Sequence, residues 1–451
     1  MVTRREFLRL VSAATAGAVG TAGLSTTAVA GQQRASRQSA EVRQGPEASD
    51  NARVITPNGI SMPYEEIDGV KVYHLVAEPI DHQFAEGLDA NLWGYNGRSP
   101  GPTIEAVEGD RVRIYVSNRL PAPTTVHWHG IVPIPNGMDG VAGLNQEPIP
   151  PGETFRYEFD VEQPGTFMYH PHFDELTQMA MGMNGLLVVH PRDEEPVDRD
   201  FAMMLAEWHI PAGASRPDPG EMIDFNLATI NSKVFPATEP LVAEVGDRVR
   251  LRLGNLSIMG HHPMHLHGHT FEITATEGGR IPQTARWPDS TVLVPVGAIR
   301  EVEFVAEHPG DWAFHCHLLH HLMNQMGHAS PTMVGVDADR LTEAIQPIIP
   351  EYMTMGARGM ADMLEMDMDM EMPDNSIVMK GGDGPFGHID MAGMFNIVKV
   401  RDEIADDEDI GWYEHPEDTV ARAATDEELR RDGIEPPEMP EGSPEPDHHD
   451  H

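Results

Sequence analysis

The chain contains few cysteines and lysines, and each scarcity excludes or disfavours a type of bond or binding partner. Cys316 is the only cysteine among the 451 residues, so no intramolecular disulfide can form. Four lysines stand against 27 arginines, and the formal net charge is −41. Such an acidic chain disfavours nucleic acid and anionic membranes as partners. The balance is typical of a salt-adapted, halophilic protein, and an acidic disordered tail would add to it.

Both ends of the chain differ from its middle. Arg4 and Arg5 precede a run of small apolar residues that ends in Ala28-Val29-Ala30, a pattern that resembles a twin-arginine export signal. We therefore expect a signal peptide over 1–30, a disordered linker over 31–53, and an extracellular, cell-surface or periplasmic protein. The run is a poor membrane span, so no stable anchor is expected, although an uncleaved anchor is the alternative.

The C-terminal quarter has a biased composition. Met353 to Met394 contains eleven methionines, several of which alternate with acids, and the sequence beyond Arg401 is acidic and proline-rich. Such stretches bury too little apolar surface to offset the entropy of ordering. We expect 341–451 to be a Met-rich and acidic tail, mostly disordered.

The middle of the chain is an internal repeat of β-type segments. Short alternating runs such as Arg111–Val116 and Thr154–Phe159 are separated by glycine and proline. His127-Trp128-His129-Gly130 matches His265-Leu266-His267-Gly268, and Tyr169–His172 matches Phe314–His317. The period is too long for a solenoid. It predicts an all-β protein with two homologous sandwich domains, over 54–195 and 200–340.

The segment around Cys316 predicts a metal site. On an extended strand Cys316 points to one face, and His315 and His317 point to the other, so one peptide can touch two metal centres. Cys316 and His321, with Met326 as a weak axial ligand, supply three of the four ligands of a blue-copper site, which needs one more histidine. The alternative is a buried free cysteine among unrelated histidines.

Further histidines occur in pairs that strand geometry places on one face. Zinc could occupy one such pair, but a zinc ion needs only about four ligands. The number of pairs therefore favours copper, for which imidazole, thiolate and thioether are all suitable ligands. The H-x-H pairs are His127/His129, His170/His172, His265/His267 and His315/His317.

These four motifs, in order, resemble the copper motifs of the multicopper oxidases, the laccase family. The likeness extends from Pro100 to about Met333, and the flanking Asn96–Thr103 and the stretch from Met138-Asp139-Gly140 through Pro148–Gly152 also look like laccase sequence. It implies two tandem cupredoxin-like Greek-key β-sandwich domains and four coppers per chain. The implied ligands are His262, Cys316, His321 and Met326 for type 1 copper; His127 and His265 for type 2; His129, His170 and His317 for one type 3 copper; and His172, His267 and His315 for the other. Four further histidines are off-register and are left out: His261, His269, His320 and His328.

The resemblance also implies an assembly. In the first repeat Thr124, Pro171 and Leu176 stand where type 1 ligands stand in the second, although Met181 aligns with Met326. Too little chain separates the motifs for a third sandwich, so the sequence resembles the two-domain, small-laccase type. Each chain of that type supplies half of a three-copper cluster at either end, which predicts a homotrimer with interfacial clusters.

The implied activity is a copper-dependent oxidoreductase that uses O2 as acceptor. One-electron oxidation of donors at type 1 copper would be coupled to reduction of O2 to water. Phenols or metal ions, possibly Cu(I) or Mn(II), are the expected donors. Asp139 is the candidate proton donor, Asp174 and Glu175 are weaker candidates, and Leu322 stands where many relatives carry an acid.

Three alternatives stay open. One is a cuprous or manganese oxidase in metal homeostasis, for which phenols are only surrogates and for which the soft thioethers of the Met-rich stretch are suited. A copper nitrite reductase shares the two-domain trimeric plan but lacks the type 3 histidines. A copper-sequestering protein would bind the metal without turnover.

Overall fold

The computed structural model describes residues 54–193, 197–211, 213–326, 338–348, 374–404 and 411–436. The expected signal peptide and linker lie outside these residues. None of the helices in the described ranges is long and apolar enough to cross a membrane.

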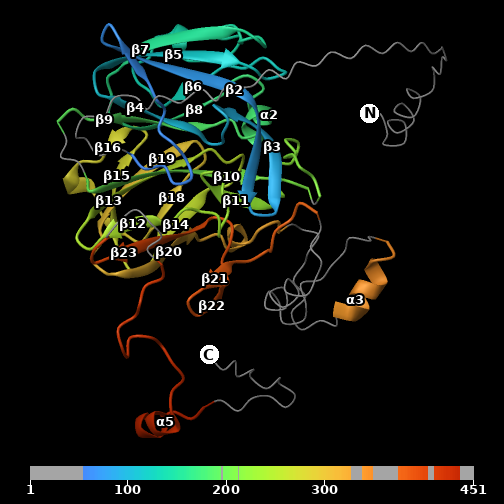
Figure 1. Ribbon diagram of the computed structural model, residues 1–451, viewed down its shortest axis with the longest axis vertical. Helices are drawn as coiled ribbons and strands as arrows, with labels where there is room; N and C mark the ends of the chain where they lie inside the picture. The colour runs from blue at the N-terminus through green and yellow to red at the C-terminus, as the bar shows by residue number, and fades with distance from the viewer. Residues whose placement is uncertain are drawn as a thin grey trace, which may run out of the picture. The chain divides into compact units, whose positions relative to one another are not determined.

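The first repeat folds as a β-sandwich (Figure 1). The predicted alternating runs lie in β5 and β7, which pair antiparallel and place every second side chain in the core. One sheet has the order β1-β2-β5-β7, with β3 paired to β2, and the other has the order β4-β9-β8-β6. The elements are β1 (Glu65–Ile67), β2 (Val70–Ala85), β3 (Leu88–Tyr95), β4 (Gly101–Val107), β5 (Asp110–Asn118), β6 (His127–His129), η1 (Asn136–Met138), β7 (Thr154–Val161), β8 (Gly165–His170), α2 (Glu175–Ala180) and β9 (Gly185–His190).

The second repeat folds in the same way. Its larger sheet has the order β11-β10-β13-β19-β15-β16, with β17 on β15, and its smaller sheet has the order β12-β23-β20-β14-β18. The elements are β10 (Arg199–Trp208), β11 (Leu227–Ile230), β12 (Leu241–Glu244), β13 (Arg248–Asn255), β14 (His262–Leu266), β15 (Phe271–Thr276), β16 (Gly279–Arg280), η2 (Gln283–Ala285), β17 (Pro288–Asp289), β18 (Thr291–Val294), β19 (Ala298–Val305), β20 (Gly310–Cys316), η3 (Leu319–Leu322) and β23 (Phe395–Arg401). The remaining elements are α3 (Ala338–Ile345), β21 (Gly382–Gly384), β22 (Gly387–Ile389) and α5 (Asp426–Asp432).

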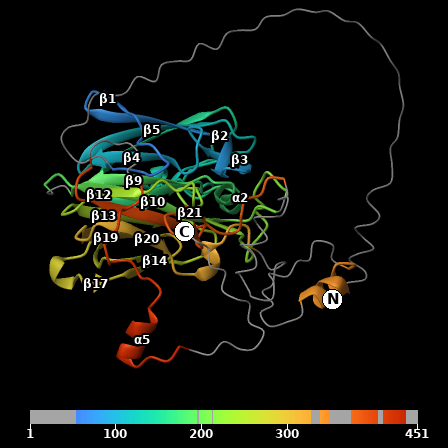
Figure 2. The same ribbon diagram turned by 60° about the horizontal axis from the view of Figure 1, so that its bottom comes forward.

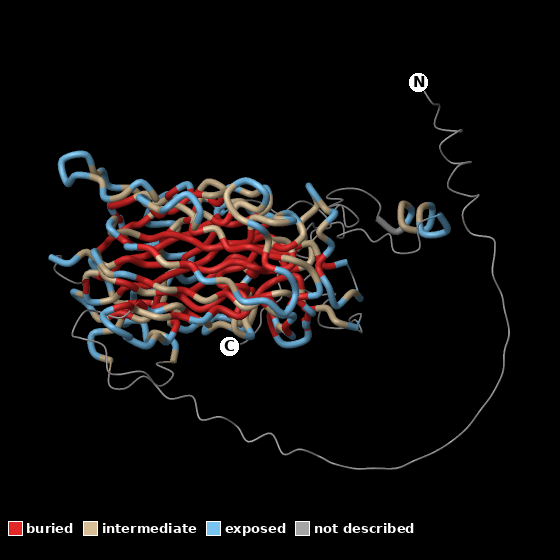
Figure 3. Tube along the Cα trace, turned by 90° about the horizontal axis from the view of Figure 1, so that it is seen from above, coloured by how far each residue is buried: buried red, intermediate tan, exposed pale blue. Residues whose placement is uncertain are grey.

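The predicted all-β, two-sandwich fold is therefore confirmed. Figure 3 shows continuous buried runs through the middle of the molecule, and strands such as β10 and β13 are buried along almost their whole length. The two sandwiches also pair their histidine strands in one register: His127 lies opposite His170, and His265 lies opposite His315.

The prediction of a mostly disordered tail is wrong for residues 374–404. β23 pairs antiparallel with β20 and parallel with β12, inside the smaller sheet (Figures 1 and 2). Phe395, Val398 and Val400 are buried in the second sandwich. The residues of β23 favour a strand, but β23 is short and follows the Met-rich stretch. The composition of that stretch dominated the sequence-based prediction. The second sandwich therefore continues well past residue 340.

Two kinds of contact join the sandwiches. The β2–β3 hairpin of the first packs Phe84 and Leu88 with Trp208 and Leu227 of the second. A buried ion network forms the other contact: Arg252 binds Asp200 and Glu301, and Thr166 of β8 donates to Glu301 at 2.7 Å. Because these charges are paired, burial does not leave one uncompensated.

Candidate metal centres

Three side chains in the second sandwich form a compact group of metal-binding atoms. His262 is on β14, Cys316 ends β20, and His321 is in η3. The two Nδ1 atoms are 3.2 Å apart, and they lie 3.7 Å and 3.4 Å from Cys316 Sγ. A metal bonded at about 2.1 Å to nitrogen and about 2.3 Å to sulfur separates such ligands by about 3.3–3.8 Å. The donor set therefore fits one metal ion at its centre.

The far nitrogens of both imidazoles are also held. His262 Nε2 lies 2.7 Å from Ser257 Oγ, and His321 Nε2 lies 3.1 Å from Glu207 Oε1. The Nδ1 atoms consequently point at the thiol, and a ring proton on Nε2 of each imidazole would leave Nδ1 free to bind a metal. Sequence reasoning missed Ser257 and Glu207. Neither belongs to a spaced motif, so only the folded chain reveals them.

The surroundings favour the neutral forms of His262 and Cys316. Burial, and then the neighbouring His321, lower the pKa of His262 to about 3. Burial raises the pKa of Cys316 to about 12. Burial alone would also raise the pKa of Glu207, but the hydrogen bond from His321 and the nearby imidazoles hold it below its ordinary value. A neutral imidazole is ready to bind metal, whereas the thiol must release a proton to do so.

The expected axial ligand lies in the chain just after η3. Met326 is half-buried. The preceding Gln325 is anchored by the backbone N–H of Ile377, which donates to its Oε1 at 2.8 Å. The axial role of Met326 stays a prediction.

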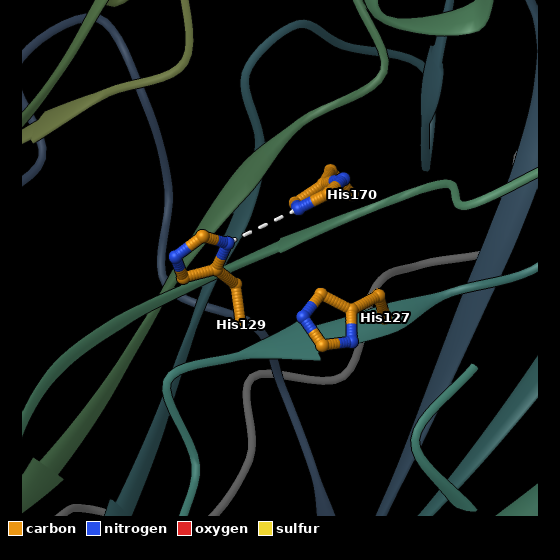
Figure 4. A group of neighbouring side chains, drawn as sticks. All are labelled: His127, His129 and His170. Atoms are coloured by element: carbon orange, nitrogen blue, oxygen red, sulfur yellow. Dashed lines mark hydrogen bonds between the residues drawn. The ribbon is translucent and has the colours of Figure 1, made fainter. Parts of the chain in front are cut away.

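Four imidazoles gather on the first sandwich. The ring of His127 has its centroid 5.3–5.6 Å from those of His129, His170 and His172. His129 Nδ1 lies 3.3 Å from His170 Nε2, and Figure 4 shows these two rings facing each other across β6 and β8. That spacing allows both to bind one metal ion.

The second sandwich repeats this arrangement. His265 has its ring centroid 4.8–5.6 Å from those of His267, His315 and His317. His267 Nε2 lies 3.2 Å from His315 Nε2. The two close pairs, His129/His170 and His267/His315, are those that the sequence assigned to separate type 3 coppers. Each pair then lacks the third ligand that the sequence assigned to it from the other sandwich.

Backbone carbonyls orient both sets in the same way. His127 Nδ1 is 2.7 Å from the Asp139 carbonyl oxygen, and His265 Nδ1 is 2.8 Å from that of Ser290. His170 and His315 each direct Nδ1 to the carbonyl oxygen of the next residue, at 3.0 and 2.9 Å. Their Nε2 atoms are left to face a metal.

The two sets line different cavities of the chain. His127, His129, His170 and His172 line one of about 490 Å³, together with residues of the second sandwich that include Ser257 and Gly297. His265 and His267 line the other, of about 1040 Å³. A single chain therefore does not bring the eight imidazoles together.

Carboxylates lie beside the first set. Asp139 Oδ1 is 3.4 Å from His127 Nδ1, and Asn145 donates to Oδ2 at 2.9 Å. Glu175 lies 3.5 Å from His170 and 3.6 Å from His172 through its two oxygens. Asp174, the other weak candidate, accepts from Thr177 at the start of α2.

The off-register histidines have other contacts. His261 accepts from the backbone N–H of Val296 at 3.0 Å, and His269 packs edge-on against Trp312. His320 packs against the His321 ring. His328 lies outside the described residues.

Paired cupredoxin-like sandwiches with a cysteine–histidine triad and repeated imidazole sets define a copper-protein architecture. Two family profiles, both described as multicopper oxidase, match residues 76–194 and 212–334, together more than half of the chain. The chain belongs to the multicopper oxidase family, whose members are copper-dependent oxidoreductases.

Individual relatives agree with that family. Laccase-1 of Cryptococcus neoformans var. grubii is 32% identical over 226 residues, which are 43% of this chain and 35% of that protein. Copper resistance protein A of Pseudomonas syringae pv. tomato is 44% identical over 115 residues, 25% of this chain and 18% of that protein. The crystal structure of the blue copper oxidase from Nitrosomonas europaea matches with a TM-score of 0.54 and 26% identity, over 73% of this chain and 85% of that one. The chain spans less than half the length of the curated relatives it matches.

Proposed function

We propose that the protein is a laccase-like oxidase that couples one-electron oxidation of small donors to reduction of O2 to water. The observation that carries this is the position of Cys316. Its thiol belongs to the triad, whereas its chain neighbours His315 and His317 belong to an imidazole set. One peptide thus joins a donor-side metal site covalently to an O2-side site. The proposed ligands are those that the sequence assigned, with four coppers per chain and Met326 as axial ligand.

We propose a cyclic homotrimer in which the first set of one subunit meets the second set of the next. Each set is incomplete alone, and exposed apolar side chains flank both. Leu144 is 78% exposed in the loop between β6 and β7, and Leu319 is 67% exposed two residues after His317. Such residues are suited to an interface, since a head-to-tail contact that closes forms a ring.

The coppers would supply the redox chemistry, and the chain's residues would hold and protonate the site. Asp139 is the proposed proton donor, since its carboxylate lies beside His127 and is oriented by Asn145. The backbone carbonyls hold the cluster imidazoles with Nε2 directed to the metals. The neutral states of His170 and His315, whose pKa values burial lowers, keep those nitrogens available.

Metal analysis with optical and EPR spectra of the purified protein tests this proposal. Four coppers per chain, a blue absorption band, a type 2 signal and a three-chain mass are expected, with O2 uptake on an electron-rich phenol. Copper bound without O2 uptake would instead indicate sequestration. Nitrite turnover without O2 consumption would indicate a nitrite reductase, which the second-sandwich position of the triad disfavours.

A metal-ion donor is the second candidate. The relative from Pseudomonas is named a copper resistance protein, and Met353 to Met394 is rich in soft thioethers. A cuprous or manganese oxidase would give faster O2 uptake with Cu(I) or Mn(II) than with phenols. Comparing these donors at equal concentration decides between the two candidates.

We further propose export by the twin-arginine route to an extracellular, cell-surface or periplasmic location, and adaptation to salt. The lysines support the second point: Lys71 and Lys380 are paired with Asp110 and Asp390, and Lys399 lies over Trp412. Lys233 donates to the Gln83 carbonyl. All four lysines therefore have structural contacts, and the chain has 72 acidic residues against 31 lysines and arginines. Cell fractionation and melting temperature against salt concentration test these two points.

A further inference from the structure

One loop of the second sandwich contacts two metal sites. The coupling loop, residues 256–261, connects β13 to β14; it begins just after Asn255 and ends just before His262. Ser257 Oγ binds His262 Nε2 at 2.7 Å. The backbone N–H of Gly260 donates to Glu207 Oε2 at 2.7 Å, and the other oxygen of Glu207 binds His321. Both imidazoles of the triad are thus tied to this loop.

The same loop borders the first imidazole set of the same chain. Leu256, Ser257 and Ile258 line the cavity that contains the first set. The adjacent turn also lies against this set, because a Cβ added to Gly297 would lie 3.8 Å from Cε1 of the His129 ring. Ser257 therefore touches a triad ligand while it lines the cavity of the other site.

The loop has little freedom to move at one site alone. Asn255 is fully buried, and it donates to the carbonyls of Gly260 and Val294, both at 2.9 Å. Its Oδ1 accepts from the backbone N–H of Ser257 at 2.9 Å. A Cβ on Gly260 would lie 1.9 Å from Glu207 Oε1, so the loop lies directly against that carboxylate. A movement of the coupling loop at the cavity would consequently also move the residues that hold the triad.

We propose that the coupling loop links the type 1 site to the first imidazole set of its own chain, with Ser257 as the positioning residue between them. The inference rests on the proposed function. The second set is already joined to the triad through Cys316. In the trimer the two sets of one chain belong to different clusters, so each cluster would influence the type 1 sites of two subunits. Hydrogen bonding at Nε2 makes an imidazole a stronger ligand and favours the oxidised metal.

The midpoint potential and EPR spectrum of type 1 copper in the copper-loaded full chain test the role of Ser257. Ser257→Ala should raise the potential and alter the hyperfine pattern, and Ser257→Thr, which keeps the hydroxyl, should restore both. Ile258→Val is the matched control, since Ile258 lines the same cavity without binding His262, and it should leave the potential unchanged. Equal potentials in the wild-type and Ser257→Ala chains would overturn the role.

A double-mutant cycle with His172→Ala tests the coupling itself. This change at the cluster should shift the type 1 potential more in the wild-type and Ser257→Thr backgrounds than in the Ser257→Ala background. Equal shifts would mean that the influence passes wholly through Cys316, and the proposal would be wrong. Ser257→Gly replaces the alanine variant if that variant does not hold copper. A wild-type chain without a blue band would contradict the proposed function, whereas equal shifts with the band present would contradict only the coupling.

Discussion

The two sandwiches share a fold and a histidine register, yet only the second has a sulfur-containing triad. In the first, Thr124 stands at the repeat position of His262 and is fully buried. Its hydroxyl donates to Gln178 Oε1 at 2.6 Å, and Gln178 Nε2 donates to the Pro123 carbonyl. A neutral hydrogen-bonded pair thus occupies this region of the first sandwich. The imidazole sets occur in both sandwiches, so they do not require the triad.

The two kinds of site also differ in how their imidazoles are held. Backbone carbonyls orient four members of the imidazole sets, whereas the side chains of Ser257 and Glu207 orient the triad. A carbonyl is present whatever the residue, but a side chain is lost by a single substitution. The triad should therefore be the more sensitive site to mutations of residues that do not themselves bind metal.

Cys316→Ser should have the largest effect and should separate the two kinds of site. A hydroxyl is a poor replacement for the thiolate that copper needs, so the blue band should vanish and turnover should fall by more than about 100-fold. The imidazole sets should keep their coppers, because His315 and His317 remain in register. Copper analysis with EPR checks this outcome. Unchanged turnover would remove the triad from the proposed mechanism.

Gly393→Ala should damage the second sandwich specifically. Gly393 has φ +55°, and a Cβ there would lie 2.2 Å from the His321 carbonyl oxygen. The cost includes about 1–3 kcal/mol of backbone strain and a displacement of His321, so the type 1 spectrum should change as well.

Gly246→Ala is the matched control for that substitution. Gly246 also has a positive φ, +98°, but its added Cβ would meet nothing within 4 Å. It should lower the unfolding free energy through strain alone and leave the spectrum unchanged. If both variants behaved alike in chemical denaturation and EPR, the contact between Gly393 and His321 would not be needed to position the triad.

Gln178→Leu should affect the first sandwich without changing the copper spectrum. It removes the closer acceptor of the buried Thr124 hydroxyl and leaves only the Thr125 carbonyl at 3.3 Å, which costs about 1–3 kcal/mol of stability. Adding Thr124→Val removes both polar groups and should recover much of the loss. Urea denaturation of the single and double variants measures this. A change in the blue band would show that the two sandwiches are coupled more tightly than their contacts imply.

Period and spacing were sufficient to predict alternating strands, the repeat and the pairing of histidines on one face, because a strand alternates its faces whatever surrounds it. The assignment of each histidine to a copper came from the family resemblance. The partners that orient the triad were not predictable. Glu207 is one acid among many, and its function arises only where β10 passes behind η3. β23 was missed for a different reason: its pairing with β20 depends on a long-range contact that no local pattern signals.

A contact between the two sandwiches should make a smaller contribution to the unfolding free energy, and that contribution should depend on pH. His82 on β2 lies 2.6 Å from the Ser232 carbonyl oxygen in the second sandwich, and burial lowers its pKa to about 4. The unfolded chain, with an ordinary pKa near 6.5, therefore binds more protons between about pH 4 and 6.5. The stability that His82 contributes is complete above that window and declines as the pH falls through it, by about 1–2 kcal/mol between pH 6.5 and 5.

His82→Gln keeps a donor but does not titrate, so the wild-type advantage over this variant should shrink on acidification. Urea denaturation of both copper-loaded chains at about pH 7 and 5 measures the difference, and a constant gap would mean that the pKa of His82 is the same in the folded and unfolded chains.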